Sequence, residues 1–297
     1  MYDVIIVGMG PAGMSASIYA KRSGMNTLIL EKSAPGGLLN QTSLVDNYLG
    51  FSAVSGSELA MSMFNHINKL GIPFKSEEVT SILDKGDYKE IITNKNTYQT
   101  RSVILSAGRK AKTVLKNEEQ YLGKGLSYCA VCDAAFYKGK DVAIIGSGNS
   151  AFEEGLYLTD FVNKLYILSR KDTLRADEHL IEKMKEKNNV EILYETTVND
   201  VILTDNKISA LETNKGTLKV EGLFIYAGYT ASTHYLKDLD IKTDNGYIIV
   251  DENMRTNIKG IYAAGDAIKK SLYQIVTAAS EGSIAATSAK KDLPKEK

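Results

Sequence analysis

The fold is decided by the segment Val4-Ile5-Ile6-Val7-Gly8-Met9-Gly10-Pro11-Ala12-Gly13. Its first four residues are all apolar and predict a buried strand, and a glycine-rich loop follows at once. Residues 14–22 predict a helix with small residues on its inner face, and residues 27–30 predict a second strand. The order strand, glycine-rich loop, helix and strand is a βαβ unit and is typical of a dinucleotide-binding domain.

The glycines of this loop have separate expected roles. Gly8 permits the tight turn, Gly10 lets the backbone approach a pyrophosphate, and Gly13 allows the helix to pack closely on the strand. The start of the helix offers unpaired N–H groups and positive dipole to the phosphates. Glu31 closes the second strand and is placed to accept hydrogen bonds from a ribose. We therefore predict a dinucleotide site here rather than a purely structural glycine turn.

The same pattern recurs later in the chain. Residues 141–145 predict a second buried strand, which enters the loop Gly146-Ser147-Gly148-Asn149-Ser150-Ala151. A helix over residues 152–158 and a strand over 164–168 follow. Each such loop begins its own sheet, so two dinucleotide-binding domains are expected. The candidate residues in the second loop are Gly146, Gly148, Asn149, Ser150 and Ala151.

The two units differ where a ribose would bind. The position equivalent to Glu31 is Ser169, which is followed by Arg170, Lys171 and then Arg175. A carboxylate would repel a 2′-phosphate, whereas an uncharged residue backed by three cations attracts one. This pattern favours NADP over NAD, and the alternative is a solvated basic loop.

Several segments between and after the two loops predict how the domains are connected. An antiparallel meander is expected over residues 79–85, 90–93 and 98–100. Residues 101–108 predict a strand that rejoins the first sheet, so the chain leaves the first domain near Gly108 and returns near Gly228. We expect an α/β protein of two Rossmann-like, three-layer domains, the second inserted into the first. The expected bounds are 1–109 with 230–297 for the first domain and 110–229 for the second.

The chain has only two cysteines, Cys129 and Cys132, and Asp133 follows them. In a reducing cytosol such a pair is catalytic or metal-binding rather than a structural staple. Zinc needs about four ligands, and we expect no metal because the histidines are scattered singly. They are His66, His179 and His234, and none is given a role. A close dithiol shortly before the second nucleotide loop predicts electron transfer through a disulfide.

The charge balance and the hydropathy exclude two classes of partner. Lys and Arg number 36, as do Asp and Glu, so the net charge is zero and no field attracts nucleic acid. No apolar run approaches the roughly 18 residues that would span a membrane. The first residues enter a strand directly, without a signal segment. A cytoplasmic protein is expected.

With these motifs the chain resembles the low-molecular-weight thioredoxin reductases, which are FAD enzymes of the two-dinucleotide-binding-domain flavoproteins. The matching stretches are residues 8–13, 129–133, 146–154 and 260–266. They occur in the family's order along the whole chain. Cys-x-x-Cys-Asp just before the second loop is the specific element, because relatives such as glutathione reductase carry the dithiol in the first domain.

The resemblance implies that FAD binds the first domain. Asp266 matches the acid near the ribitol or pyrophosphate, and Gln274 and Ile275 begin a helix whose N-terminus faces the pyrimidine end of the ring. That dipole would stabilise the negative charge of a reduced flavin. The implied FAD residues are Gly8, Gly10, Pro11, Ala12, Gly13, Glu31, Lys32, Gly36, Gly37, Leu38, Asn47, Val79, Ala107, Gly108, Gly265, Asp266, Tyr273, Gln274 and Ile275.

The resemblance also implies a mechanism. Cys132 matches the sulfur nearest the flavin, Cys129 the sulfur that attacks the substrate disulfide, and Asp133 the acid–base group. The implied partner is thioredoxin, and the implied assembly is a homodimer. The second domain of the family rotates against the first, so hinges are expected near Gly108 and Gly228.

The chain departs from the family at the sites of the electron donor. The usual His-Arg-Arg is Ser169-Arg170-Lys171, Leu38 replaces a glutamine, and Leu272-Tyr273-Gln274 replaces Tyr-Arg-Gln. Two donors therefore stay open, NADPH and reduced ferredoxin. With ferredoxin, Tyr273 would cover the flavin where a nicotinamide otherwise stacks. A third alternative is an FAD-dependent dithiol oxidase that passes electrons to oxygen.

Overall fold

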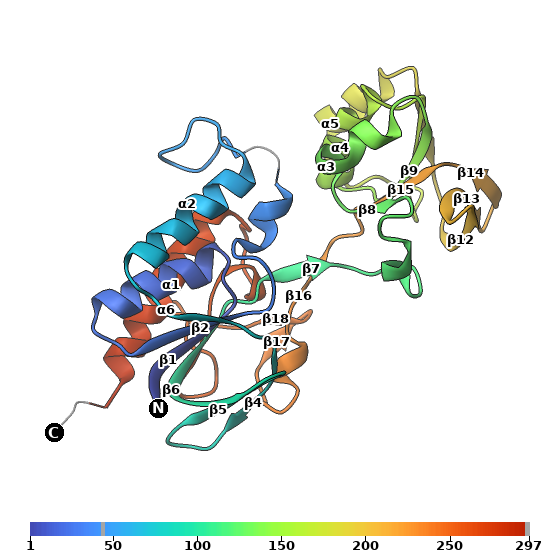
Figure 1. Cartoon of the computed structure of the whole chain (residues 1–297). Coiled ribbons are helices and arrows are strands. Elements are labelled where there is room, and N and C mark those ends of the chain that lie inside the picture. Colours follow the sequence, from blue (N-terminus) through green and yellow to red (C-terminus); the bar gives the residue numbers. More distant parts are fainter. Residues whose placement is uncertain (43–44, 295–297) are drawn as a thin grey trace. The chain divides into compact units, whose positions relative to one another are not determined.

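The computed structural model describes residues 1–42 and 45–294, apart from the side chains of Gln41, Val131 and Cys132. The chain divides into two compact units (Figure 1). Unit 1 consists of residues 1–110 and the segment from residue 230 onward, and unit 2 of residues 111–229. Both units contain parallel sheets with helices, which confirms the expected α/β class.

Unit 1 is built on a seven-stranded sheet with the order β3-β2-β1-β6-β5-β4, and β19 also pairs with β6. Strands β1, β2, β3, β6 and β19 are parallel, whereas β4 and β5 run antiparallel to their neighbours. The bounds are β1 Tyr2–Val7, β2 Thr27–Glu31, β3 Phe74–Ser76, β4 Val79–Asp84, β5 Lys89–Thr93, β6 Thr97–Leu105 and β19 Ile261–Ala263.

The two faces of this sheet have different covers. On β1, Val4 and Ile6 pack with apolar residues of the helices, while Ile5 and Val7 pack with Tyr235 on the other face. This alternation follows from the two-residue period of a strand. The helices α1, α2 and α6 form one layer (Figure 1). Their bounds are α1 Pro11–Arg22, α2 Gly56–Lys69 and α6 Ile275–Asp292, and the opposite face carries η4 His234–Leu236, β17 Thr243–Asp244 and β18 Tyr247–Ile248.

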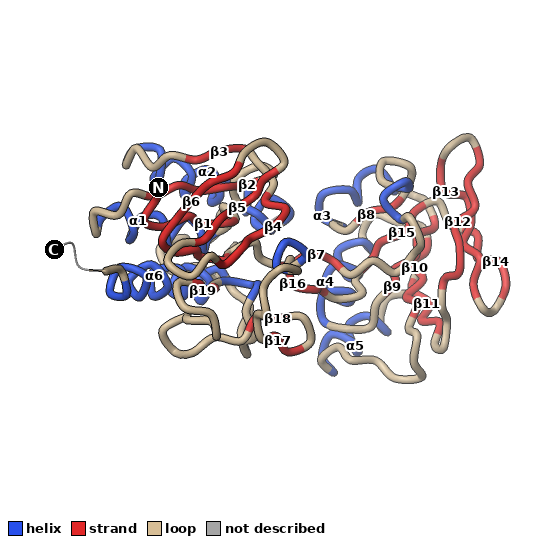
Figure 2. Tube along the Cα trace, turned by 90° about the horizontal axis from the view of Figure 1, so that it is seen from below, coloured by secondary structure: helices blue, strands red, loops and turns tan. Residues whose placement is uncertain are grey.

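Unit 2 has three layers (Figure 2). Its central sheet is parallel, with the order β11-β10-β9-β15-β8. Phe152 of α4 packs on one face, and Leu211 of an antiparallel sheet packs on the other. The strands are β8 Leu126–Ser127, β9 Asp141–Ile145, β10 Lys164–Leu168, β11 Val190–Leu193, β12 Val198–Thr204, β13 Lys207–Thr213, β14 Gly216–Lys219 and β15 Gly222–Ile225. The helices are α3 Ala130–Asp133, α4 Asn149–Thr159 and α5 Glu178–Lys185.

The chain crosses between the units twice, and the two crossing strands pair with each other. They are β7 Arg109–Ala111 and β16 Tyr229–Ala231. The remaining short helices are η1 Gly37–Gln41, η2 Glu118–Tyr121, η3 Ala134–Tyr137 and η5 Gly265–Ala267.

One sequence prediction was wrong in a specific way. The third strand of the expected meander and the expected strand over residues 101–108 form the single strand β6. Its first part pairs antiparallel with β5, and Thr100 to Leu105 pair parallel with β1. No turn residue separates Thr100 from Arg101, so the strand continues while its partners change. Helices α1 and α4 also begin three residues earlier than predicted, because the ends of the glycine-rich loops already form the first helical turns.

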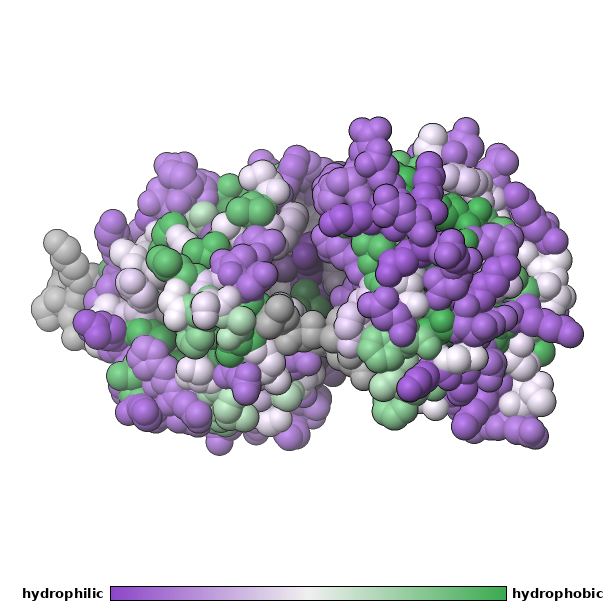
Figure 3. Space-filling view, turned by 90° about the horizontal axis from the view of Figure 1, so that it is seen from above, coloured by the Kyte–Doolittle hydropathy of each residue, from purple (hydrophilic) through white to green (hydrophobic). Residues whose placement is uncertain are grey.

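The surface is mixed in polarity. Hydrophilic residues cover much of the face in Figure 3, and apolar residues interrupt them in small areas. The exposed large apolar side chains include Leu49, Phe136 and Leu272. Within the described ranges, none of the helices combines the length and the apolar character needed to cross a bilayer.

Candidate active site

The loop of unit 1 has the conformation that its glycines predict. Gly8 has a φ of +103°, and a Cβ there would lie 2.5 Å from the carbonyl oxygen of Ser106. A Cβ on Gly13 would lie 1.9 Å from the carbonyl oxygen of Gly8. At Gly10, by contrast, a Cβ would have no atom within 4 Å. The conformational roles of Gly8 and Gly13 are confirmed, and the space beside Gly10 is open.

Helix α1 begins at this open space. Gly10 is its N-cap and provides no side-chain cap, Pro11 occupies its first position, and its first turn contains no acidic residue. Its first N–H groups are therefore not satisfied by a capping side chain and can receive an anion. A Cβ on Gly37 would have only the Cα of Gly10 within 4 Å, at 3.7 Å. The segment Gly36-Gly37 therefore lies beside the loop, and the Gly36 N–H donates to the Met9 carbonyl at 2.8 Å.

Glu31 contacts the same loop. Its Oε2 accepts a hydrogen bond from the Met9 N–H at 2.6 Å, and its Oε1 accepts one from the Ser33 N–H at 2.8 Å. The carboxylate therefore holds the loop to the end of β2, a role that the sequence did not reveal. Lys32 is exposed and pairs with Glu78 at 3.5 Å. Val79 is buried in the core of unit 1, in the same apolar cluster as Val7.

A second group of predicted residues meets at the start of α6. Gln274 is the N-cap of this helix, and its side-chain oxygen accepts a hydrogen bond from the Asn47 amide at 3.2 Å. These residues are 227 positions apart in the chain. Both side chains are exposed and therefore accessible from solvent. Leu38 in η1 and Ile275 at the first position of α6 are half-buried.

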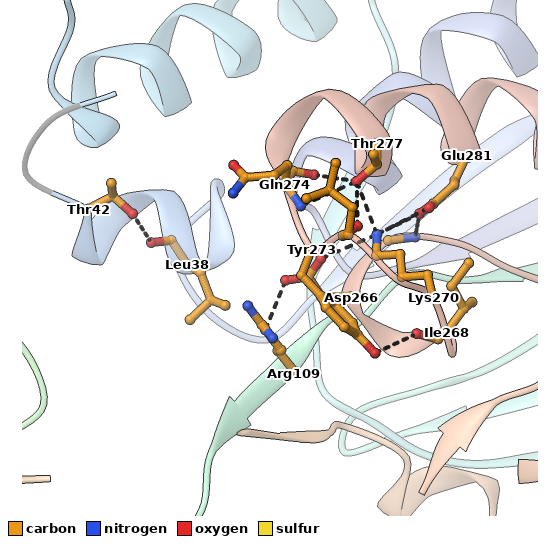
Figure 4. A network of polar contacts seen from close by, with 12 residues as sticks. Leu38, Thr42, Arg109, Asp266, Ile268, Lys270, Tyr273, Gln274, Thr277 and Glu281 are labelled. Carbon is orange, nitrogen blue, oxygen red and sulfur yellow. Dashed lines mark hydrogen bonds and ion pairs between the residues drawn. The ribbon is translucent and has the colours of Figure 1, made fainter. Parts of the chain in front are cut away.

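Asp266 lies in a network of charges (Figure 4). Its Oδ2 is 3.0 Å from Arg109 Nε, and its Oδ1 is 3.5 Å from Lys270 Nζ. Lys270 also pairs with Glu281 at 2.9 Å, and Glu281 accepts the Gly265 N–H at 2.9 Å. Burial raises the pKa of Glu281. The acid predicted to serve a cofactor is thus supported by two cations that the sequence analysis did not identify.

Tyr273 is part of the same network. The Arg109 guanidinium lies over its ring at 4.5 Å from the centroid, and the Tyr247 ring lies at 5.5 Å. Burial raises the pKa of Tyr273, and the neighbouring Tyr247 adds to the shift. Ala107 and Gly108 are half-buried in the segment between β6 and β7. Arg109, which directly follows Gly108, therefore links the end of β6 to Tyr273, which lies just before α6.

The dithiol segment lies in unit 2, where Cys129 directly precedes α3 and Cys132 lies within this helix. Cys129 is buried and disulfide-bonded, and the chain has one other cysteine, Cys132. The Cys132 side chain lies outside the described residues. The Cys129 N–H donates to the Ser127 hydroxyl at 3.1 Å, and this hydroxyl donates to the Cys129 carbonyl at 3.2 Å. Asp133 is half-buried on α3. The burial of Tyr137, together with the charge of Asp133, raises the pKa of Tyr137 to about 12.

Two carboxylate–tyrosine pairs hold the residues on either side of Cys129. Before it, the Tyr128 hydroxyl donates to Glu118 at 2.5 Å, and Glu118 is 2% exposed. After it, the Ala130 N–H donates to the Tyr226 oxygen at 2.8 Å and to Glu154 Oε2 at 3.0 Å. The sequence analysis missed these pairs, because nothing in the local pattern marks either carboxylate.

The second glycine-rich loop has the same design as the first. A Cβ on Gly146 would lie 2.7 Å from the Tyr226 carbonyl oxygen, whereas one on Gly148 would have no atom within 4 Å. Gly148 is the N-cap of α4. The Asn149 amide donates to Asp177 at 2.9 Å, which ties the loop to the segment before α5. Ser150 is exposed and Ala151 is buried.

The predicted cations lie beside this loop. The Arg175 N–H donates to the Ser147 carbonyl at 2.7 Å. The Gly146 N–H donates at 3.2 Å to the carbonyl of Leu168, the last residue of β10 before Ser169. Arg170, Lys171 and Arg175 are exposed. Over the part of the chain that the structure describes, no ion pair includes them.

Two dinucleotide-type loops in separate units, with a disulfide-bonded cysteine in the second, define the class of flavin- and nicotinamide-binding disulfide oxidoreductases. Residues 2–282 match the pyridine nucleotide-disulphide oxidoreductase family, and the chain belongs to it. The chain is therefore an FAD-dependent oxidoreductase. The expected fold of two Rossmann-like domains agrees with its structural relatives.

Individual relatives agree with this assignment. The chain is 40% identical over 295 residues to the thioredoxin reductase of Bacillus subtilis. The aligned part covers 97% of this chain and 93% of the relative. A crystal structure of Lactococcus lactis thioredoxin reductase matches with a TM-score of 0.88 at 39% identity, over 98% of this chain and 99% of that chain. A crystal structure of a ferredoxin-flavin thioredoxin reductase from Clostridium acetobutylicum matches with a TM-score of 0.56 at 33% identity. This match covers 98% of this chain and 97% of that chain. The resemblance to thioredoxin reductases is confirmed.

Proposed function

We propose that the protein is a thioredoxin reductase that transfers two electrons from NADPH, through FAD and the Cys129–Cys132 disulfide, to thioredoxin. The observation that carries this proposal is the disulfide-bonded Cys129 at the start of α3, in the unit that also holds the second dinucleotide loop. The relatives named thioredoxin reductase support the choice of substrate.

FAD is assigned to unit 1. Three features fit it: the open space at Gly10, the start of α1 without a capping side chain, and the start of α6 at Gln274. Glu31 would bind the adenosine ribose with lone pairs that the backbone N–H groups leave free. Asp266 would face the ribitol or pyrophosphate, with Arg109 and Lys270 offsetting the repulsion between its carboxylate and a phosphate. When bound, FAD supplies the electron pair to the disulfide.

The cysteines would carry the next steps. Two electrons and two protons convert the disulfide to two thiols. The Cys129 thiolate then attacks the disulfide of thioredoxin and forms a mixed disulfide, with one thioredoxin sulfur leaving. Cys132 attacks the Cys129 sulfur, which restores the enzyme disulfide and releases reduced thioredoxin. Asp133 would hold the proton that a leaving thiolate requires.

The basic loop of unit 2 supports NADPH as the donor. Arg170, Lys171 and Arg175 are exposed cations beside the loop that contains Gly148, and an anionic 2′-phosphate would pair with them. Lys171 offers a single ammonium where relatives have a planar guanidinium.

Reduced ferredoxin is the second candidate donor. The observation that favours it is Tyr273, whose ring is held between Arg109 and Tyr247 and could cover the flavin face. One structural relative is named a ferredoxin-flavin thioredoxin reductase. Anaerobic stopped-flow mixing decides between the donors: we expect NADPH to bleach the flavin absorbance within a turnover time. No bleaching by NADPH together with rapid bleaching by reduced ferredoxin would reverse the choice.

The disulfide step has its own test. In Cys132→Ser we expect FAD to stay bound and thioredoxin reduction to be lost. Full turnover of thioredoxin by this variant would overturn the proposed path of electrons. Oxygen uptake with a small dithiol, without reduction of thioredoxin, would instead indicate a dithiol oxidase.

We further propose that the active form is a homodimer in the cytoplasm, where thioredoxin is kept reduced. Light scattering at micromolar concentration should give twice the chain mass of 32.5 kDa. Unit 2 is proposed to rotate on the crossing segments near Gly108 and Gly228. A crosslink that fixes one arrangement should stop turnover, and full turnover when crosslinked would contradict the rotation.

A further inference from the structure

A closed triangle of hydrogen bonds lies behind the residue that follows Cys129. The Ala130 N–H is shared between the Tyr226 oxygen at 2.8 Å and Glu154 Oε2 at 3.0 Å. The Tyr226 hydroxyl in turn donates to the same Glu154 oxygen at 3.2 Å. Glu154 lies on α4 and Tyr226 directly follows β15, so two elements of unit 2 converge on one peptide of the dithiol turn.

The surroundings make this carboxylate electrostatically effective. Ala130 is completely buried, and Glu154 and Tyr226 are half-buried. Burial raises the pKa of Tyr226, and the charge of Glu154 raises it further, so the phenol stays a hydrogen-bond donor. A charge in such a place is screened less than one in water.

Other titratable groups lie on the elements around the turn. They are Asp133 on α3, Tyr137 on η3, Tyr229 at the start of β16, and the Glu118–Tyr128 pair before Cys129. The Lys140 ammonium lies 5.9 Å from the centroid of the Tyr137 ring.

The effect on the thiol follows from its charge. Backbone N–H groups at the start of a Cys-x-x-Cys turn stabilise the thiolate and lower the pKa of the first cysteine. Here the Ala130 N–H is already bound by Glu154 and Tyr226, and a carboxylate beside it repels a thiolate. The thiolate of the reduced couple is thereby destabilised relative to the disulfide, which lowers the reduction potential at any pH where Cys129 would otherwise be ionised.

We propose that Glu154, held by Tyr226, is a positioning residue that keeps the Cys129 disulfide couple strongly reducing. The inference rests on the proposed function, because a reductase of thioredoxin needs a couple at or below about −270 mV. In this role Glu154 acts through the Ala130 peptide.

The test measures the couple itself and needs no thioredoxin. The FAD-loaded, full-length protein is equilibrated anaerobically at pH 7 in buffers with a set ratio of reduced to oxidised dithiothreitol. The free thiols are then alkylated with N-ethylmaleimide and counted by intact-protein mass spectrometry. In Glu154→Gln we expect the exchange constant to shift about tenfold toward the dithiol, about 30 mV for this two-electron couple. The pH midpoint of thiol alkylation should fall in the same variant.

Two further variants separate charge from shape. Tyr226→Phe keeps the carboxylate but removes the hydrogen bond that holds it and one acceptor of the Ala130 N–H, so its exchange constant should shift toward the dithiol by less than that of Glu154→Gln. Glu154→Asp also keeps the charge and should stay within twofold of the wild type. The matched controls are Glu182→Gln on the exposed side of α5 and Tyr157→Phe on α4, and both should match the wild type.

The outcomes are distinct. A wild-type constant in Glu154→Gln would overturn the inference, as would a shift of Tyr226→Phe as large as that of Glu154→Gln, which would show that the shape of the triangle and not the charge sets the constant. If Glu154→Gln does not fold, a tenfold shift in Glu154→Asp overturns the inference and a wild-type constant supports it. A wild-type disulfide that never exchanges with the buffer would instead refute the proposed function, and the inference with it.

Discussion

Gly10 and Gly13 should respond in opposite ways to the same added methyl group. In Gly10→Ala the new Cβ meets no atom within 4 Å, and the φ of −81° and ψ of −175° suit alanine. The variant without FAD should therefore be as stable as the wild type, or about 0.5 kcal/mol more stable, because alanine loses less entropy on folding. In Gly13→Ala the Cβ would lie 1.9 Å from a backbone oxygen, so α1 must move, at a cost of about 3 kcal/mol or more.

Gly10→Ala should weaken the binding of FAD, although it does not lower the stability of the protein. The methyl group of Gly10→Ala would occupy the space assigned to the pyrophosphate and displace it from the first N–H groups of α1. Losing one charge-assisted hydrogen bond costs about 1.5–3 kcal/mol, which is roughly tenfold to a hundredfold in the dissociation constant. Urea unfolding gives the stability, and titration with FAD followed by flavin fluorescence gives the affinity.

Gly148→Ala is the matched control, because its Cβ is equally free of contacts but lies in unit 2. It should bind FAD normally and raise the KM for NADPH. Wild-type FAD affinity in Gly10→Ala would refute the assignment of the pyrophosphate to this space. A loss of stability as large as that of Gly13→Ala would refute the geometric argument.

Three more changes have defined outcomes. Arg170→Ala should raise the KM for NADPH about tenfold and leave the KM for NADH unchanged, because only NADPH carries the 2′-phosphate; equal effects in steady-state assays would contradict this. Lys270→Met should lower the free energy of unfolding by about 3 kcal/mol, because the half-buried carboxylates Asp266 and Glu281 lose their shared cation. Urea unfolding within about 1 kcal/mol of the wild type would contradict this. The Arg255 guanidinium donates to both oxygens of Asp292 at 2.8 and 3.0 Å and holds the pKa of this carboxyl below its usual 3.8. A depressed pKa gives stability that is present above pH 3.8 and is lost as the pH falls through the folded-state pKa. Asp292→Asn should therefore lower the free energy of unfolding by about 1 kcal/mol at pH 7, a value that allows for the solvent exposure of the pair. The loss should become progressively smaller below pH 3.8. A difference in stability between variant and wild type that does not change with pH would show that the charge is not responsible.

The βαβ units could be predicted from the sequence because every local signal agrees there. The apolar strand, the glycine spacing and the small residues of the helix all require the same structure. The conformational roles of Gly8 and Gly13 followed from spacing alone. Strand β6 was predicted as two strands, because its change of partner from β5 to β1 leaves no mark on its own residues.

The polar contacts around the sites could not be predicted in the same way. Arg109 and Asp266 are far apart in sequence, and their ion pair depends on β7 and η5 lying close together in unit 1. Ala130 and Tyr226 are 96 residues apart. Such pairs depend on which strand ends become neighbours, and hydrophobic periodicity carries no information on that.

The packing of α6 on α1 affects how the protein can be made. A Cβ on Gly282 would lie 2.1 Å from the carbonyl oxygen of Ala12, so the two helices touch backbone to backbone. During synthesis on the ribosome, α1 and β6 emerge long before α6 and β19, while all of unit 2 is already available to fold. The apolar flank of α1 therefore stays open through most of translation. We expect the nascent N-terminal half to be a client of chaperones, and flavin loading to be one of the last events of maturation.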